Sequence, residues 1–177
     1  MSILARSQIL KEIEAGRIRI EPFDPEMLGP ASVDLHLSNA FRFFVRIPTI
    51  VEVTNALDFK RYTKGIWIPD GKSVKLQPGE TLLGITCEKV TLPDNVCGWL
   101  EGRSRFARIG LLIHISASFM QPGISNHQVL EISNFGHLEL EIFPSTPVCQ
   151  FVFQRTEGHG AYEGIYHEQT PETFWRD

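Results

Sequence analysis

The residues best suited to chemistry in this sequence are two arginines, a serine and a later glutamate. Arg103 and Arg108 lie five residues apart with Ser104 between them, in a segment that glycines bound on both sides. Guanidinium groups, a hydroxyl and nearby backbone amides together suit an anion such as phosphate. Glu131 follows in an apolar run, and a carboxylate beside a bound anion can act as an acid or a base. The pattern indicates an anion site with a candidate catalytic carboxylate.

Short apolar runs surround these residues and predict the scaffold that positions them. The runs cover residues 81–87, 96–100, 111–117, 129–132, 138–143 and 148–153, with proline, glycine or asparagine between most of them. A further run at 31–37 alternates apolar and polar residues, and Phe41, Phe43 and Val45 continue it. Strands at this spacing favour an all-β barrel or sandwich over alternating β-α-β units. Within the polar face of the run at 31–37, Asp34 is interpreted as a structural hydrogen-bond acceptor.

Both ends of the chain depart from this strand pattern. Residues 7–15 predict one short amphipathic helix, with Ser7 as its N-cap and Gly16 just past its end. Ile18 and Ile20 alternate with charged residues and predict a half-exposed strand. Residues 54–71 indicate a solvated excursion. The tail, residues 158–177, is too polar for a core strand, and we expect either a loose end or a flap over the site.

Composition limits the class of protein. The 177 residues carry 42% hydrophobic and 21% charged side chains, which predicts one globular domain spanning residues 1–177. A formal net charge of −4 argues against a nucleic acid polymer as partner. With neither a signal-peptide pattern nor an apolar run of the ~18 residues that a membrane span needs, we expect a cytoplasmic protein without a membrane partner. Cys87, Cys97 and Cys149 are odd in number and far apart, and predict buried free thiols.

Common nucleotide and hydrolase motifs are absent from the sequence. It contains no Gly-x-x-x-x-Gly-Lys-Ser, no Gly-x-Gly-x-x-Gly and no Gly-x-Ser-x-Gly segment. His137, Glu139 and Cys149 imitate a zinc deaminase pattern, but the second cysteine of that pattern is missing. We therefore expect no protein-bound metal.

A family resemblance extends this interpretation. The block 96–104, with residues 107–111, Ala117, Pro122-Gly123 and Leu130-Glu131, closely resembles the dCTP deaminase family. Further likeness lies at 31–35, 77–80, 90–93, 149–153 and in the tail. The family belongs to the dUTPase-like trimeric β-barrel superfamily. The resemblance implies a mainly β, dUTPase-like distorted barrel or jelly roll with a short N-terminal helix, assembled as a homotrimer with sites between subunits.

The resemblance also implies an activity, namely hydrolytic deamination of dCTP to dUTP and ammonia without a metal at the base. Glu131 would transfer the protons, Ser104 would hold the attacking water, and Arg108 would lie against the site. Mg²⁺ would accompany the nucleotide, held chiefly by phosphate oxygens. The substrate-binding residues implied are Arg103, Ser104, Arg105, Phe106, Ala107, Arg108, Ala117, Gln121, Val129, Leu130, Glu131, Gln150, Tyr162, Tyr166 and Gln169. Residues 158–177 would close over the triphosphate as a flap.

Some positions differ from the family pattern. Gln121 replaces an aspartate that positions the phosphate-attacking water in the dUTPase branch, and an amide cannot act as that base. Ile124 replaces an aromatic ring that packs on the deoxyribose. Arg105 is interpreted as supplying the charge that a tail lysine usually provides and that Ile165 lacks. Two alternatives remain: a dUTPase or bifunctional dUMP-forming deaminase, and a non-catalytic nucleotide-binding regulator.

Overall fold

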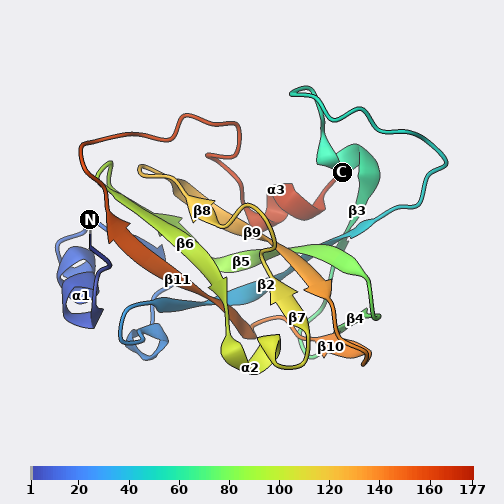
Figure 1. Ribbon diagram of the computed structural model, residues 1–177, viewed down its shortest axis with the longest axis horizontal. Coiled ribbons are helices and arrows are strands. Elements are labelled where there is room, and N and C mark those ends of the chain that lie inside the picture. The colour runs from blue at the N-terminus through green and yellow to red at the C-terminus, as the bar shows by residue number, and fades with distance from the viewer. Residues whose placement is uncertain (1) are drawn as a thin grey trace.

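The described part of the chain, residues 2–177, folds mainly into strands, with a helix near each end and short helices between some of the strands (Figure 1). The helices are α1 (Arg6–Glu14), η1 (Pro25–Met27), η2 (Phe59–Tyr62), α2 (Ser104–Ala107) and α3 (Pro171–Trp175), of which η1 and η2 are 3-10 helices. The strands are β1 (Arg19–Glu21), β2 (Val33–Phe44), β3 (Thr63–Trp67), β4 (Val74–Leu76), β5 (Thr81–Thr91), β6 (Val96–Gly102), β7 (Leu111–Ile113), β8 (Phe119–Met120), β9 (Ser125–Asn134), β10 (Leu140–Ile142) and β11 (Pro147–Arg155).

One curled sheet of nine strands forms the body of the computed structural model. Its strands follow the order β7-β9-β5-β2-β11-β6-β8, while β1 pairs with β5 and β3 pairs with β2. Strands β10 and β4 form a separate two-stranded ribbon. The pairings of the main sheet are antiparallel. This architecture confirms the mainly β barrel-like prediction.

The core follows the alternation of apolar and polar residues in the sequence at the start of β2. Val33, Leu35 and Leu37 of β2 are fully buried, whereas Asp34 and His36 between them are partly exposed. Burying alternate side chains fixes the register, because a one-residue slip would turn the apolar set toward water.

The N-terminal helix is confirmed, but Ser7 is not its N-cap. α1 begins at Arg6, its N-cap is Ala5, and no side chain caps it. The Arg6 amide instead donates to the carbonyl of Pro30 at 2.7 Å, so a tertiary contact satisfies a donor that a cap would otherwise satisfy. Gly16 follows the helix with a φ of 68°, as expected of a residue that ends a helix.

The run predicted as a strand over 111–117 extends only to Ile113. His114 has a φ of 66°, which lies in the left-handed region and is incompatible with an extended strand. The chain therefore leaves the sheet at His114, and residues 114–117 form a loop beside β9.

The tail does not end loosely. Residues 156–170 run back across the molecule, and α3 packs against β2, β3 and β5 (Figure 1). Phe174 of α3 is 2% exposed, which the polar composition of the tail does not predict.

The three thiols are free, as predicted, with Cys97 and Cys149 buried and Cys87 partly buried. Desolvation, with a smaller contribution from Glu88, raises the pKa of Cys87 to about 11. No helix among residues 2–177 is long and apolar enough to cross a membrane.

Candidate active site

Glu131 lies at the centre of the candidate site, on β9 opposite Leu83 of β5. Its Oε2 accepts hydrogen bonds from the amides of Ile115 at 3.1 Å and Ser116 at 2.8 Å. The hydroxyl of Ser116 lies 3.1 Å from Oε1 and 3.0 Å from Oε2. Backbone and hydroxyl donors thus fix the position of a half-buried carboxylate.

The loop that provides these donors turns at His114. The amide of His114 donates to the carbonyl of Glu131 at 2.9 Å. Its Nε2 lies 2.7 Å from the carbonyl oxygen of Ala117, which can only accept, so Nε2 carries the proton. Nδ1 is buried without a hydrogen-bond partner among the described residues. The left-handed His114 therefore turns the loop toward the carboxylate.

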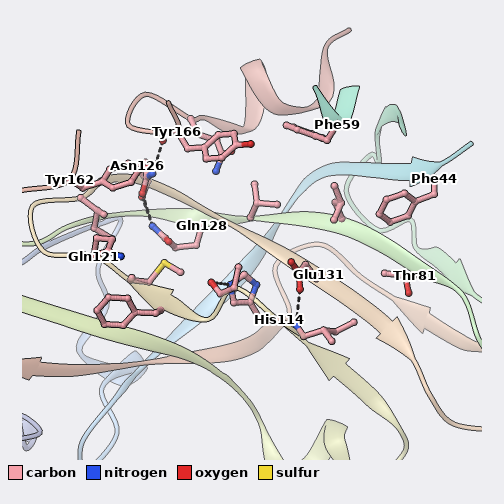
Figure 2. Close-up of a pocket in the computed structure, with 18 residues that line it drawn as sticks. Phe44, Phe59, Thr81, His114, Gln121, Asn126, Gln128, Glu131, Tyr162 and Tyr166 are labelled. Atoms are coloured by element: carbon pink, nitrogen blue, oxygen red, sulfur yellow. Dashed lines mark hydrogen bonds between the residues drawn. The ribbon is translucent and has the colours of Figure 1, made fainter. Parts of the chain in front are cut away.

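Glu131 and His114 line a pocket of about 700 Å³. Figure 2 shows the residues that line it. The lining residues are Phe44, Phe59, Thr81, Leu83, His114, Ile115, Ala117, Phe119, Met120, Gln121, Ile124, Asn126, Gln128, Val129, Glu131, Tyr162, Tyr166 and Gln169. This volume lies within the range typical of small-molecule sites, and a mostly apolar wall with a few polar groups is also typical of them.

Neutral amides form the end of the pocket nearest the tail. Gln128 Nε2 donates to the carbonyl of Asn126 at 3.1 Å and to its Oδ1 at 2.7 Å. Asn126 Nδ2 donates to the carbonyl of Tyr166 at 2.6 Å. Because backbone carbonyls can only accept, both amides are fixed in one orientation. The contact between β9 and the tail closes this end of the pocket.

A second pocket, of about 350 Å³, contains the predicted anion-binding residues. Arg103 pairs with Asp34 at 3.0 Å and donates to the carbonyl of Pro147 at 3.1 Å. Ser104 and Arg105 also line this pocket, together with Gln150. The Asp34 side chain thus forms an ion pair with Arg103 at the edge of this pocket.

The structure divides the predicted site residues between two places. The first pocket contains Ala117, Gln121, Val129, Glu131, Tyr162, Tyr166 and Gln169, and the second contains Arg103, Ser104, Arg105 and Gln150. Phe106, Ala107 and Arg108 line neither pocket, and Leu130 is fully buried. Within one chain, Glu131 therefore does not share a pocket with Ser104 or Arg108.

Sequence reasoning missed His114, Ser116 and Gln128. The run 111–117 read as a continuous strand, in which Ser116 would not turn both its amide and its hydroxyl toward β9. Gln128 follows the polar residues Ser125, Asn126 and His127 and precedes the apolar run at 129–132, so the sequence offered no signal that its amide is buried.

Metal ligands are sparse around both pockets. No group of three or more His, Cys, Asp or Glu side chains that could hold a metal ion occurs within residues 2–177. Asp34 is the one carboxylate lining the second pocket, and Arg103 already pairs with it.

Comparison with known proteins gives the family. Residues 3–156 match the family described as dCTP deaminase-like. The chain belongs to this family. The resemblance seen in the sequence is thereby confirmed.

Two bacterial relatives of this dCTP deaminase-like chain are both named "dCTP deaminase, dUMP-forming". One, from Nocardioides sp., is 40% identical over 156 residues and covers 86% of this chain and 80% of its own length. The other, from Clavibacter michiganensis, is 39% identical over 176 residues, with coverages of 94% and 86%.

A solved structure supports the fold. The 2'-deoxycytidine 5'-triphosphate deaminase from Agrobacterium tumefaciens superposes with a TM-score of 0.68 at 17% identity. The match covers 87% of this chain and 48% of that chain, so the dCTP deaminase-like chain spans about half the length of that protein.

Proposed function

We propose that this protein hydrolytically deaminates dCTP and releases ammonia, in cytoplasmic deoxynucleotide metabolism. The observation that carries this proposal is the carboxylate of Glu131, which faces a pocket of about 700 Å³ and is held by the Ile115 and Ser116 donors. Membership of the dCTP deaminase-like family and the names of the two relatives support the same chemistry.

In the proposed reaction Glu131 transfers the protons. It takes a proton from water as the water oxygen adds to C4 of cytosine, and ring N3 gains a proton. Glu131 then transfers the remaining proton of the added hydroxyl to the amino group, the C4–N bond breaks as the C4 carbonyl forms, and ammonia leaves. Water and dCTP thus yield dUTP and ammonia with all atoms accounted for. Proton transfer of this kind contributes about 10²–10⁴-fold to a rate.

A second copy of the chain would complete the site. None of the residues lining the Glu131 pocket is a lysine or arginine, whereas a bound triphosphate requires cationic partners. Ser104 and Arg108 are exposed, and their side chains form no hydrogen bond within residues 2–177. We propose a homotrimer in which Arg103, Ser104 and Arg108 of an adjoining subunit face Glu131, and Mg²⁺ enters with the triphosphate.

The product depends on Gln121. Gln121 lies at the exposed rim of the pocket, and its amide cannot take a proton from a water that attacks phosphate. This observation favours dUTP as the product. The names of the two relatives favour a second candidate, in which deamination is followed by pyrophosphate release and dUMP is formed.

Product analysis with dCTP, dUTP and CTP distinguishes these functions. Ammonia from dCTP without pyrophosphate supports the dUTP-forming deaminase. Equal amounts of ammonia and pyrophosphate from dCTP support the dUMP-forming enzyme. Pyrophosphate from dUTP, with no ammonia from dCTP, indicates a dUTPase. Saturable nucleotide binding without either product would overturn the enzymatic proposal in favour of a regulator.

A further inference from the structure

Arg42 of β2 is a fully buried guanidinium, at 0% exposure. Its Nε donates to Thr63 Oγ1 at 2.8 Å, and its Nη2 donates to the Thr63 carbonyl at 3.1 Å. Its Nη1 donates to the carbonyl of Phe174 at 2.7 Å, and Nη2 pairs with Asp177 at 2.6 Å. A buried charge requires such partners, and two of them belong to the last four residues of the chain.

A second cation binds the same helix from outside. Lys60 of η2 donates to the carbonyls of Thr173 at 2.8 Å and Arg176 at 2.6 Å. Cations that meet carbonyls at a helix C-terminus satisfy groups without intrahelical partners. Arg42 and Lys60 therefore hold the end of α3 from two sides.

The helix held in this way supports the wall of the Glu131 pocket. Phe174 packs in a buried cluster that includes Leu83, Val129 and Phe59. All three of these residues also line the pocket. Displacing Phe174 would remove the packing behind that wall, although neither Phe174 nor Arg42 lines the pocket itself.

The segment just before α3 closes the pocket. Gln169 accepts from the amide of His127 at 3.2 Å through its carbonyl, and its Nε2 donates to the His127 carbonyl at 3.0 Å. The Tyr166 carbonyl accepts a hydrogen bond from Asn126, which lies on β9 next to His127. Figure 2 shows Tyr166 and Phe59 on the side of the pocket where the tail helix lies. Gln169 and Tyr166 therefore depend on an anchor only a few residues away.

We propose that Arg42 is a positioning residue for nucleotide binding. By fixing α3, it keeps Tyr166 and Gln169 over the pocket and keeps Phe59, Leu83 and Val129 behind the substrate. This inference rests on the proposed function for its substrate, dCTP. The anchoring itself concerns only contacts within the chain.

Kinetics of Arg42→Met test the positioning role. This variant preserves much of the side-chain bulk and removes every donor. We expect the KM for dCTP to rise about 10-fold while kcat stays within about 3-fold, because the lost contacts hold the pocket rather than the reacting atoms. Arg42→Lys retains the charge and should recover part of the affinity. Lys60→Met removes the contacts that hold the same helix from the solvent-exposed side, and it should raise KM by a smaller factor. This variant also tests the proposal if Arg42→Met does not fold.

Arg155→Met is the matched control. Arg155 pairs with Glu12 of α1, so the variant removes an ion pair that anchors the opposite terminal helix. We expect it to lower stability and leave KM unchanged. An unchanged KM in both folded Arg42→Met and Lys60→Met, or an equal rise in Arg155→Met, would overturn the positioning role.

Chymotrypsin cleavage without nucleotide tests the anchor independently of the substrate. Tyr166, Phe174 and Trp175 are its potential cleavage sites in this region. Mass spectrometry should show these bonds protected in the native protein and in Arg155→Met, and cleaved faster in Arg42→Met. Equal protection in Arg42→Met would contradict the anchor. If the native protein releases no ammonia from dCTP while these cleavage differences occur, the proposed function fails and the anchor stands.

Discussion

Ser116 donates both its amide and its hydroxyl to the carboxylate of Glu131, with distances of 2.8 and 3.0 Å to Oε2. The two residues lie fifteen positions apart, and the turn at His114 brings them together. Because the donors come from one short loop, the position of the carboxylate depends on the shape of that loop.

Replacing the carboxylate tests its role directly. Glu131→Gln retains the shape of the side chain but cannot take a proton from water, so ammonia release from dCTP should fall about 10²–10⁴-fold. Calorimetry should show dCTP binding close to that of the native protein. Glu141→Gln, an exposed change on β10, is the control and should retain activity. Full turnover by Glu131→Gln would remove it from the mechanism.

Removing the Ser116 hydroxyl should have a smaller effect. Ser116→Ala leaves both backbone amide donors in place, so we expect kcat to fall about 10-fold or less, with KM nearly unchanged. Ser116→Thr retains the hydroxyl and should be close to the native rate. Steady-state assays of ammonia release at saturating dCTP measure the difference. Ser116→Ala with the activity loss of Glu131→Gln would show that the hydroxyl participates in the chemistry.

Mixing two inactive variants tests the shared site. Glu131→Gln and Arg108→Ala should each be inactive as homotrimers. After joint refolding in equal amounts, about one site in four would combine an intact Glu131 with an intact Arg108 from the next subunit, so roughly a quarter of the activity should return. No recovery in mixed trimers, verified by mass, would indicate that each chain builds its own site.

The ion pair between Asp34 and Arg103 predicts an effect on phosphate binding. Asp34→Asn weakens the contact that orients Arg103, so the KM for dCTP should rise several-fold with little change in kcat. Binding of the unphosphorylated nucleoside should not change. Asp70→Asn, in a turn before β4, is a control outside both pockets. An equal loss of nucleoside binding would contradict a specific effect on phosphate.

Glu12 predicts how stability depends on pH. Its carboxylate is buried, and hydrogen bonds, first from Arg17, lower its pKa from 4.5 to about 2 despite the opposing effect of desolvation. The unfolded chain therefore binds this proton at a higher pH than the folded chain does. The stabilisation is present above about pH 4.5 and is lost as the pH falls toward 2.

Urea unfolding from pH 6 to 2.5 measures this effect. Glu12→Gln should be less stable than the native protein at pH 6, by on the order of 2 kcal/mol, and should lose less of its stability on acidification. Glu14→Gln is the control, because Glu14 lies on the same helix and its side chain is exposed. Parallel pH curves for the native protein and Glu12→Gln would contradict the assignment.

Sequence alone determined the local pattern. Alternating burial over residues 33–37 of β2 and the glycine that ends α1 followed from side-chain polarity and backbone freedom, which act over a few residues. The resemblance to the dCTP deaminase family could also be recognised from the sequence, because Gly-Arg-Ser and Leu-Glu are contiguous motifs. The Leu-Glu motif was sufficient to predict Glu131 as a candidate site residue, and in the structure Glu131 lines a pocket.

Only the tertiary structure decided which distant groups meet. It placed Ser116 against Glu131, separated Glu131 from Arg108, and joined Arg42 to Phe174 across 132 residues. These contacts depend on strand register and on one left-handed residue, His114, that breaks an otherwise strand-like run. No local preference specifies them, because the free energy that selects them comes from pairing β9 with β5 and from burying α3 against β2, β3 and β5.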